Sequence, residues 1–288
     1  EELKVKRGAG PKDLPIHAHK KEILETVQGH PVMILMGETG SGKSTQLPQF
    51  LLEAAGSEGG QIVITQPRRI AAISVAARVA AEMGVALGGL VGYRVRFEEK
   101  AGPDTRILFV TDGILMREFL RNPTLERIST LVVDEAHERS VNGDIIFALA
   151  KDLTLLRPDF RLIIASATMD PRKFSFYFRG APVVDVPGRK FPVDIFYSKA
   201  PEEDYVEAGV ITVLQIHLTQ PSGDVLFFLT GEEDIELARG MLSLRARSLS
   251  RKFGEIVIVP LHGSLSSDQQ ALAFAPTPRG ARKVVLAT

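Results

Sequence analysis

The sequence has no cysteine, which excludes disulfide bonds, zinc sites built from thiolates and cysteine nucleophiles. No apolar run approaches the ~18 residues that a membrane-spanning helix needs, and the longest run, 31–36, is far too short. The opening segment also lacks the apolar stretch of a secretory signal. Lys and Arg number 35 and Asp and Glu number 35, so the absence of net charge argues against a polycation that coats nucleic acid. A local basic groove is still allowed.

The sequence also shows no signature of two common kinds of catalytic site. The spacing of His, Asp and Glu does not resemble a zinc site. No Ser-His-Asp arrangement stands out either. The 288 residues are enough for about two domains with a sizeable core. Because the sequence does not begin with Met and stops inside the apolar run 283–288, we expect a fragment of a longer protein.

Short apolar runs alternate with stretches of helical character along the chain. The runs are rich in Val, Ile and Leu without alternating polar residues, which is typical of strands that helices cover on both faces. This succession predicts βαβ units and a parallel sheet. The predicted strands are 32–36, 61–65, 106–111, 130–134, 161–165, 183–186, 224–230, 256–261 and 283–288. The predicted helices are 43–55, 71–83, 113–121, 144–157 and 232–253.

A segment with two prolines and a glycine near residue 190 is the best domain boundary, because a new α/β series begins soon after it. We therefore predict a remnant of an N-terminal extension at 1–13 and a first domain at 14–186. A linker at 187–192 would lead to a second domain at 193–288 that ends before its sheet is complete.

The strongest local signal is GETGSGKST at 37–45, which fits the phosphate-loop pattern G-x-x-x-x-G-K-[ST]. It lies between a predicted strand and a predicted helix, as that loop requires. Backbone N–H groups then converge on a phosphate, and the helix N-terminus favours negative charge. Lys43 would reach the β- and γ-phosphates and Ser44 would ligate Mg²⁺. A glycine-rich turn with an incidental lysine is the disfavoured alternative.

The second signal is LVVDEAH, an apolar strand that ends in two acids. Asp134 would hold Mg²⁺, directly or through water. Glu135 is the natural general base for an attacking water. A solvated acidic turn that caps the next helix is the alternative, and the phosphate loop upstream weakens it.

Other polar residues also follow predicted strands. Ser166 and Thr168 are suited to bind a neighbouring loop or phosphate, although a helix cap is the better interpretation of that motif alone. Arg68 and Arg69, like Thr111, fall on the edge that carries the phosphate loop. They are suited to nucleic-acid phosphates or are ordinary surface residues. The residues alone predict a phosphate-loop NTPase with two α/β domains.

Taken together, the motifs resemble the DEAH-box RNA helicases of superfamily 2. The segments GETGSGKST, TQPRRIAA, VTDG, DEAHERS, SATMD and FLTGEEDIE occur in that family's order and spacing, from about Leu14 to the last residue. The resemblance implies two RecA-like domains with parallel sheets flanked by helices, the second incomplete. They would clamp ATP between them and grip single-stranded RNA. Within the family, 188–193, 197–205, 216–221 and 280–285 are similar to the spliceosomal members.

The resemblance also implies a role for each matching residue. The catalytic set, in which the last three couple hydrolysis to domain movement, is Lys43, Asp134, Glu135, His137, Ser166 and Thr168. The ATP-binding set, in which the last two stack on adenine, is Gly37, Thr39, Gly40, Ser41, Gly42, Lys43, Ser44, Thr45, Arg78 and Phe274. The Mg²⁺ set is Ser44, Asp134 and Glu135. The RNA-binding set is Arg68, Arg69, Arg96, Thr111, Thr230 and Gly231.

At the level of the whole protein, the resemblance implies an ATP-dependent RNA helicase with ATP and Mg²⁺ as cofactors. It would couple hydrolysis to translocation on pre-mRNA or snRNA and would remodel RNA–protein complexes during splicing. Its partners would be spliceosome proteins and a G-patch activator. We expect a monomer in the nucleus, without membrane association. Charge pattern alone does not separate RNA from DNA.

The alternative is a truncated fragment that binds ATP or RNA but hydrolyses ATP poorly. The family's later motif with its arginine fingers is not in the sequence, and such a finger is worth about 10³–10⁵ in rate. Two smaller departures are Arg94, where a small polar residue is common, and Gly231-Glu232-Glu233-Asp234 in place of Gly-Gln-Glu-Glu.

Overall fold

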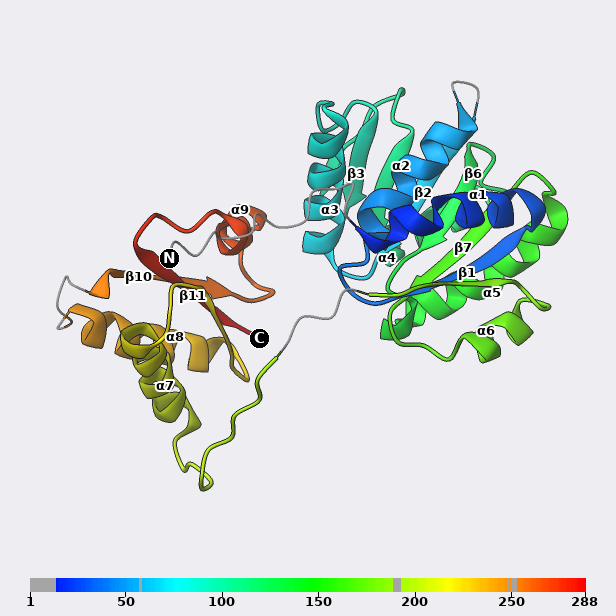
Figure 1. Cartoon of the computed structure of the whole chain (residues 1–288). Coiled ribbons are helices and arrows are strands. Elements are labelled where there is room, and N and C mark those ends of the chain that lie inside the picture. Colours follow the sequence, from blue (N-terminus) through cyan, green and yellow to red (C-terminus); the bar gives the residue numbers. More distant parts are fainter. Residues whose placement is uncertain (1–13, 57–58, 189–192, 248, 250–252) are drawn as a thin grey trace. The chain divides into compact units, whose positions relative to one another are not determined.

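The computed structural model describes residues 14–56, 59–188, 193–247, 249 and 253–288. The chain divides into two compact units, with the division between Pro192 and Val193 (Figure 1). The predicted N-terminal remnant at 1–13 and positions 189–192 of the predicted linker lie outside the described residues.

The larger unit is built on a sheet that has eight strands within the described residues, in the order β4-β3-β5-β2-β6-β7-β1-β8. Neighbouring strands are parallel, except for the antiparallel pair of β3 and β4. The strands are β1 (Val32–Gly37), β2 (Gln61–Gln66), β3 (Val91–Val95), β4 (Glu98–Lys100), β5 (Ile107–Thr111), β6 (Ile128–Val133), β7 (Arg161–Ser166) and β8 (Val183–Val186).

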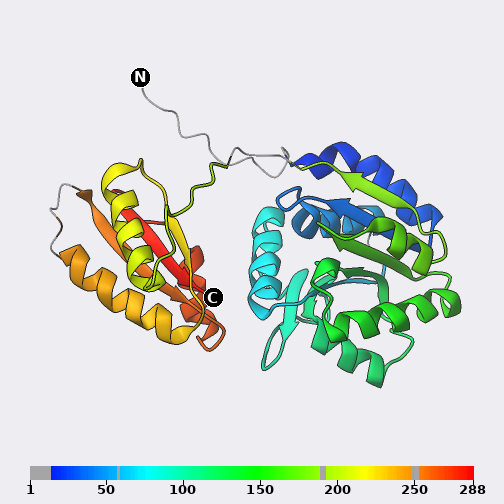
Figure 2. The same cartoon turned by 90° about the horizontal axis from the view of Figure 1, so that it is seen from below.

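Helices lie on both faces of this sheet, which explains why its strands are apolar without alternation (Figure 2). Along β1, Met33 and Leu35 pack into one core, whereas Val32 and Ile34 pack into the core on the opposite face. The first core is covered by α1 (Lys20–Gly29), α2 (Lys43–Ala55) and α3 (Arg69–Met83). The second is covered by α4 (Asp112–Arg121), α5 (Val141–Leu156) and α6 (Pro171–Tyr177).

The smaller unit has a parallel sheet of three strands in its described residues, in the order β10-β11-β9. Val284 and Leu286 of β11 are buried against Val210 of α7 and Ile235 of α8. The strands are β9 (Val225–Phe228), β10 (Glu255–Leu261) and β11 (Ala281–Ala287). The helices are α7 (Tyr205–Thr219), α8 (Glu232–Arg247) and α9 (Ser267–Ala271).

The predicted fold class, parallel sheets flanked by helices, is confirmed, but several elements differ from the prediction. The short strands β3 and β4 were not predicted, since Gly92 and Arg94 interrupt the apolar run of β3 and β4 is charged throughout. Helices α1, α6, α7 and α9 were also not predicted. The helix predicted at 232–253 ends at Arg247, and part of its remainder lies outside the described residues. No described helix is both long and apolar enough to span a membrane.

One guanidinium group fixes the turn that leads into the central strand β6. Arg157 follows α5 and donates hydrogen bonds to the carbonyl oxygens of Thr124 at 3.0 Å, Leu125 at 2.7 Å and Ile128 at 3.0 Å. Leu125 has a positive φ of 45°, a conformation that costs about 1 kcal/mol or more for a side chain with a Cβ. The arginine therefore holds a strained turn through three of its carbonyl oxygens, one of which, that of Leu125, also accepts from the backbone N–H of Ile128.

We expect Arg157→Met to lower the free energy of unfolding by about 1–3 kcal/mol, because it removes three hydrogen bonds from a charged group to the carbonyl oxygens of the turn. Urea unfolding followed by circular dichroism measures this. The control is Arg172→Met, since Arg172 is 94% exposed and has only a 3.7 Å surface pair with Asp170. Equal midpoints for the two variants would contradict the role given to Arg157.

Candidate functional site

The order of the strands brings the polar strand ends together. In a parallel sheet the carboxyl ends of all strands lie on one edge, which is where ligands bind. Strands β2, β6, β7 and β1 are consecutive neighbours. The residues that follow them are therefore adjacent in space, although the sequence separates them widely.

The phosphate-loop segment connects β1 to the start of α2, as the sequence predicts. Gly42 caps α2 with a φ of 101°, and a Cβ there would lie 2.8 Å from Ile16 Cγ2. A Cβ on Gly37 would lie 3.0 Å from Ser41 Oγ and 3.1 Å from the carbonyl oxygen of Val186. Position 42 therefore needs glycine for its φ and its close neighbour, and a Cβ on Gly37 would force its neighbours to move by a few tenths of an ångström.

Lys43 is buried at the first turn of α2, with 7% of its surface exposed. Its Nζ donates to the carbonyl oxygens of Gly37 and Glu38, the latter at 3.1 Å, and lies 3.5 Å from Ser41 Oγ. Burial lowers the pKa of the amine, although Asp134 and Glu135 oppose this by raising it. A desolvated amine that donates to neutral loop oxygens fits an anionic phosphate, which would replace them as the stronger acceptor.

The other residues predicted to bind ATP line the same loop. Ser41 is fully buried, Ser44 and Thr45 are half-buried, and Thr39 and Gly40 are exposed. Thr45 Oγ1 donates to the carbonyl oxygen of Gly42 at 3.4 Å.

Asp134 is buried directly after β6, with 3% of its surface exposed. Its Oδ2 accepts a hydrogen bond from Gln66 Nε2 at 2.5 Å, and its Oδ1 accepts one from the backbone N–H of Glu135 at 2.9 Å. No three His, Cys, Asp or Glu side chains among the described residues form a complete metal site. Mg²⁺ commonly uses one or two carboxylates and takes its other oxygens from phosphate and water. Asp134 and Ser44 fit that donor set.

Glu135 has an unusual backbone and an altered acidity. Its φ is 52°, which is uncommon for a residue with a side chain. Burial raises the pKa of the Glu135 carboxyl, Asp134 raises it further, and His137 and Lys43 oppose these effects. A carboxylate with increased proton affinity suits a general base.

His137 lies between two neighbouring strand ends. Its Nδ1 is 3.5 Å from Glu135 Oε2 and 3.3 Å from Ser166 Oγ. Ser166 is fully buried at the end of β7, and Thr168 is exposed two residues further on. His137 therefore contacts both the predicted base, Glu135, and Ser166 at the end of the neighbouring strand.

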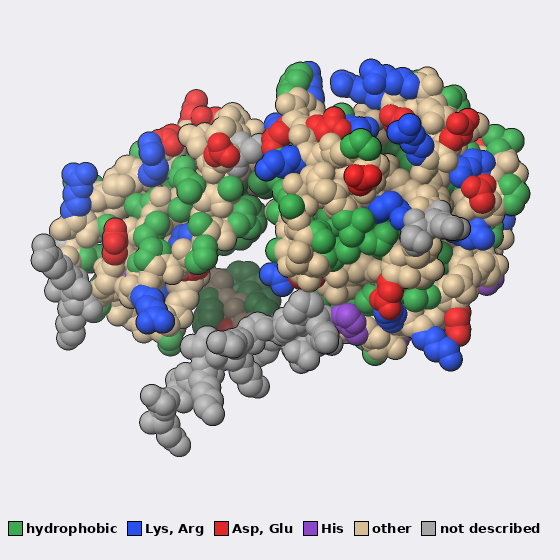
Figure 3. Space-filling model, turned by 90° about the horizontal axis from the view of Figure 1, so that it is seen from above, with side chains coloured by type: hydrophobic (Ala, Val, Ile, Leu, Met, Phe, Trp, Pro, Cys, Tyr) green, Lys and Arg blue, Asp and Glu red, His purple; other side chains and the backbone are tan. Residues whose placement is uncertain are grey.

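The arginines predicted to bind RNA form exposed ion pairs. Arg68 lies 3.2 Å from Glu138, and Arg69 lies 3.6 Å from Glu98. Exposed pairs contribute little to stability, so a nucleic-acid phosphate can displace either carboxylate at small cost. On the face shown in Figure 3, basic and acidic side chains are interspersed.

Two further predicted RNA contacts belong to the larger unit. The Arg96 guanidinium lies 4.7 Å from the ring centre of Phe97, which is 90% exposed and has a φ of 67°. Thr111 ends β5 and caps α4. Because β5 is parallel to its neighbour β2, Thr111 lies at the same edge of the sheet as the phosphate loop.

Two more predicted contacts belong to the smaller unit. Thr230 Oγ1 and the Tyr205 hydroxyl both donate to Asp234, the hydroxyl at 2.6 Å. These hydrogen bonds lower the pKa of the Asp234 carboxyl, and the one from Thr230 has the larger effect. Thr230 therefore helps to fix the first turn of α8, with Gly231 beside it.

The predicted adenine stack uses residues from different units. Arg78 pairs with Glu82 at 2.5 Å, and Gln46 and Gln49 donate to the same carboxylate at 2.8 and 3.0 Å. Burial acts to raise the pKa of Glu82, but the three hydrogen bonds outweigh it and lower the pKa. Phe274 belongs to the smaller unit and is 64% exposed. The stack remains a prediction.

The sequence analysis missed two residues that hold this site, Gln66 and Asp112. Gln66 binds Asp134, as described above, and Asp112 accepts a 2.7 Å hydrogen bond from Ser140. Both are buried polar residues at or just after strand ends. They belong to the segments 65–69 and 111–113, in which the predicted RNA contacts are the adjacent arginines and Thr111. The sequence signal that could have identified them is a polar residue at the end of an apolar strand.

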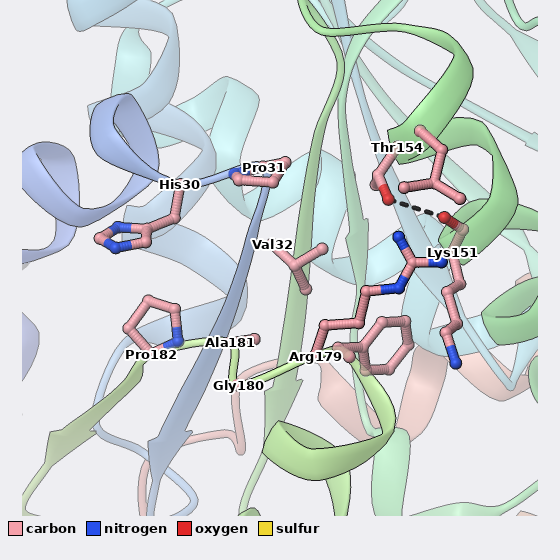
Figure 4. Close-up of a pocket in the computed structure, with 11 residues that line it drawn as sticks. His30, Pro31, Val32, Lys151, Thr154, Arg179, Gly180, Ala181 and Pro182 are labelled. Atoms are coloured by element: carbon pink, nitrogen blue, oxygen red, sulfur yellow. Dashed lines mark hydrogen bonds between the residues drawn. The ribbon is translucent and has the colours of Figure 1, made fainter.

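A separate cavity of about 150 Å³ lies at the opposite edge of the sheet, where β1 begins (Figure 4). Its lining includes Pro31, Lys151, Arg179 and Pro182. Lys151 Nζ lies 3.9 Å from the ring centre of Tyr177. None of the predicted site residues lines this cavity.

Comparison with known proteins supports one family. The sequence pattern of the DEAD/DEAH box helicases matches residues 17–175. The crystal structure of the DEAH/RHA helicase HrpB of Escherichia coli is similar to this chain, with a TM-score of 0.82 and 38% identity. The similarity covers 96% of this chain and 34% of that chain. The chain thus spans about a third of that protein's length, and its α/β fold is RecA-like, as expected.

We expect Lys43→Met to weaken binding of a fluorescent ATP analogue with Mg²⁺ by about tenfold or more. The reason is the loss of a charge-assisted hydrogen bond worth ~1.5–3 kcal/mol. Fluorescence anisotropy measures the affinity. The matched control is Lys20→Met, which removes an amine that pairs with Glu53 at 2.6 Å on the surface. If both variants bind like the unchanged chain, Lys43 does not contact phosphate.

Proposed function

The chain belongs to the DEAD/DEAH box helicase family, and from this premise we propose that it is the motor part of an ATP-dependent RNA helicase. The observation that carries the proposal is the buried amine of Lys43 in its glycine-rich loop, electrostatically coupled to Asp134 and Glu135. A phosphate-binding group, a metal carboxylate and a base on neighbouring strand ends are what nucleotide hydrolysis requires.

Each residue has a proposed task. ATP with Mg²⁺ supplies the phosphoanhydride bond whose hydrolysis drives the cycle. Lys43 neutralises phosphate charge, while Asp134 and Ser44 hold the metal. Glu135 orients the attacking water and accepts its proton, helped by its raised pKa.

His137 and Ser166 connect the base to the neighbouring strand. Their 3.3 Å contact joins the end of β7 to the loop that carries Glu135. A change at the base therefore displaces residues that follow β7, including Thr168. We propose that this contact couples hydrolysis to domain movement, by which the protein moves one step along RNA.

The nucleic-acid ligand is proposed to be single-stranded RNA. Arg68 and Arg69 follow β2, and Thr111 ends β5, so all three lie at the carboxyl-terminal ends of strands, as the phosphate loop does. Arg96 follows β3, the neighbour of the edge strand β4. Thr230 and Gly231 are the corresponding positions of the smaller unit. Contacts of this kind are made to phosphate and sugar, so binding should tolerate any sequence and weaken with salt.

The finer proposal is a role in pre-mRNA splicing in the nucleus, with spliceosome proteins and a G-patch activator as partners. It is supported by the resemblance of segments 197–205 and 216–221 to spliceosomal helicases. Purification of spliceosomal complexes from cells that carry a tagged copy tests it. Absence of the tagged protein from those complexes would remove the splicing role and leave the helicase proposal intact.

The first test of the proposal is ATP hydrolysis with and without poly-U RNA, beside the variant Glu135→Gln. We expect RNA to increase the rate, and we expect the variant to lose about 10²-fold or more, because it cannot accept a proton. Phosphate release measures both. A hydrolysis rate that the variant retains would exclude Glu135 as the base.

A second candidate is a chain that binds ATP or RNA but hydrolyses ATP poorly. It is favoured by the exposed apolar side chains of β9, Leu226 at 56% and Phe228 at 68%, which leave one face of this strand uncovered. Limited proteolysis separates the candidates. We expect a protease-resistant core that ends near Pro187 for the second candidate, and protection of the whole chain for the first.

A further inference from the structure

We propose that Gln66 and Asp112 are positioning residues that transmit RNA contact to the loop carrying the metal carboxylate and the base. This inference rests on the proposed helicase function and deepens it. Gln66 ends β2 two residues before Arg68, and Asp112 directly follows Thr111 at the end of β5, so each lies close to a residue proposed to bind RNA. Each also holds one end of the segment 134–140, called here the acidic loop.

Gln66 fixes the beginning of the acidic loop. Strands β2 and β6 are parallel, with Thr65 in register with Val133. The next residue of each strand is therefore Gln66 opposite Asp134. Gln66 is 2% exposed, and its amide donates to Asp134 Oδ2 at 2.5 Å. Because Oδ1 accepts the backbone N–H of Glu135, the carboxylate is oriented through both oxygens.

Asp112 fixes the end of the acidic loop. It opens α4 immediately after Thr111 and is 8% exposed. Ser140 Oγ donates to Asp112 Oδ2 at 2.7 Å and accepts from the backbone N–H of Gly143 at 2.9 Å. A Cβ on Gly143 would lie 2.9 Å from Ser140 Oγ. The start of α5 is therefore built around this relay of hydrogen bonds.

The acidic loop between these two contacts is strained. Glu135 and Arg139 have φ values of 52° and 48°, and each left-handed residue with a Cβ costs about 1–2 kcal/mol. Such backbone persists only when its surroundings hold it. The positions of Glu135 and His137 therefore depend on contacts at the two ends of the loop, at Asp134 and Ser140.

Asp112 has one buried oxygen that could accept a further hydrogen bond from a shifted loop. Its Oδ1 is buried and has no hydrogen-bond partner among the described residues. A small cavity borders Asp112, Asp134, Glu135 and Ser140. A buried carboxylate oxygen without a donor is costly, so a shifted loop that brings a donor to it is within reach. RNA bound at Thr111 or Arg68 would move the strand ends and bias this choice.

The two contacts differ from ordinary helix caps in one respect. A cap stabilises its own helix, whereas the Gln66 bond joins the end of β2 to the residue after β6, and the Asp112 bond joins the start of α4 to the start of α5. The partners lie 68 residues apart in sequence for Gln66 and 28 for Asp112. If they only stabilise the fold, their loss should weaken all ligands together. If they transmit, their loss should remove the effect of one ligand on the other.

The test is the coupling between RNA and nucleotide. The affinity of the full chain for a fluorescent, non-hydrolysable ATP analogue with Mg²⁺ is measured with and without saturating poly-U. We expect RNA to strengthen nucleotide binding about fivefold or more in the unchanged chain, a typical coupling. In Asp112→Ala, Ser140→Ala and Gln66→Leu this factor should fall below about twofold. In Asp112→Ala and Ser140→Ala, each ligand alone should bind with nearly its original affinity.

Three variants serve as controls. Ser175→Ala removes a comparable hydroxyl, which donates to the carbonyl oxygen of Ala181 at 2.8 Å, and it should keep the coupling. Asp112→Asn keeps an acceptor for the Ser140 hydroxyl, so it should retain more of the coupling than Asp112→Ala does. Asp112→Ala combined with Ser140→Ala should show the same coupling factor as either change alone, because both remove the Ser140–Asp112 hydrogen bond. The loss of the α5 cap in Ser140→Ala affects stability and not this factor. If Asp112→Ala does not fold, Asp112→Asn and Ser140→Ala decide the result.

The outcomes separate this inference from the proposed function. If the unchanged chain binds neither nucleotide nor poly-U, the proposed function fails. If it binds both but the affinities are independent, or if the folded variants keep the full coupling factor, the inference is wrong and the proposed function stands. Loss of coupling together with an equal loss of affinity for each ligand alone would also overturn it, because that is a structural effect.

Discussion

The parallel register of four neighbouring strands is the constraint on which the site depends. It places the ends of β2, β6, β7 and β1 side by side, so that the phosphate-loop amine, the acidic loop and Ser166 share one edge. Helices on both faces enforce this register, because a shift by one residue would exchange the two cores. The chemistry of the site is therefore supported by apolar packing well away from it.

The site requires several polar and charged side chains to be buried, which disfavours folding unless they find partners. Lys43, Asp134, Gln66 and Asp112 are all nearly excluded from water, and each would destabilise the fold if it lacked partners. Lys43 and Gln66 donate hydrogen bonds to loop oxygens and to Asp134, while Asp134 and one oxygen of Asp112 accept hydrogen bonds from neighbouring segments. The same hydrogen bonds that stabilise the fold thus orient the groups that act on a ligand.

The sequence predicted the groups whose chemistry is local. The phosphate loop, and the strand that ends in Asp134, carry their signal within a few residues. Gln66 was missed because its partner is 68 residues away, and only the β2–β6 register reveals the pair. Helices α1 and α7 were missed for another reason. Their apolar faces are recognisable only once the sheet that they cover is known.

The edge strand β4 has a consequence for the behaviour of the protein in solution. It consists of Glu98, Glu99 and Lys100 and closes one side of the sheet. An open sheet edge is a template on which other chains can add strands, and charged residues prevent this. The β3–β4 hairpin therefore insulates the sheet against self-association. Substitutions that neutralise it would favour aggregation without touching the core or the nucleotide loop.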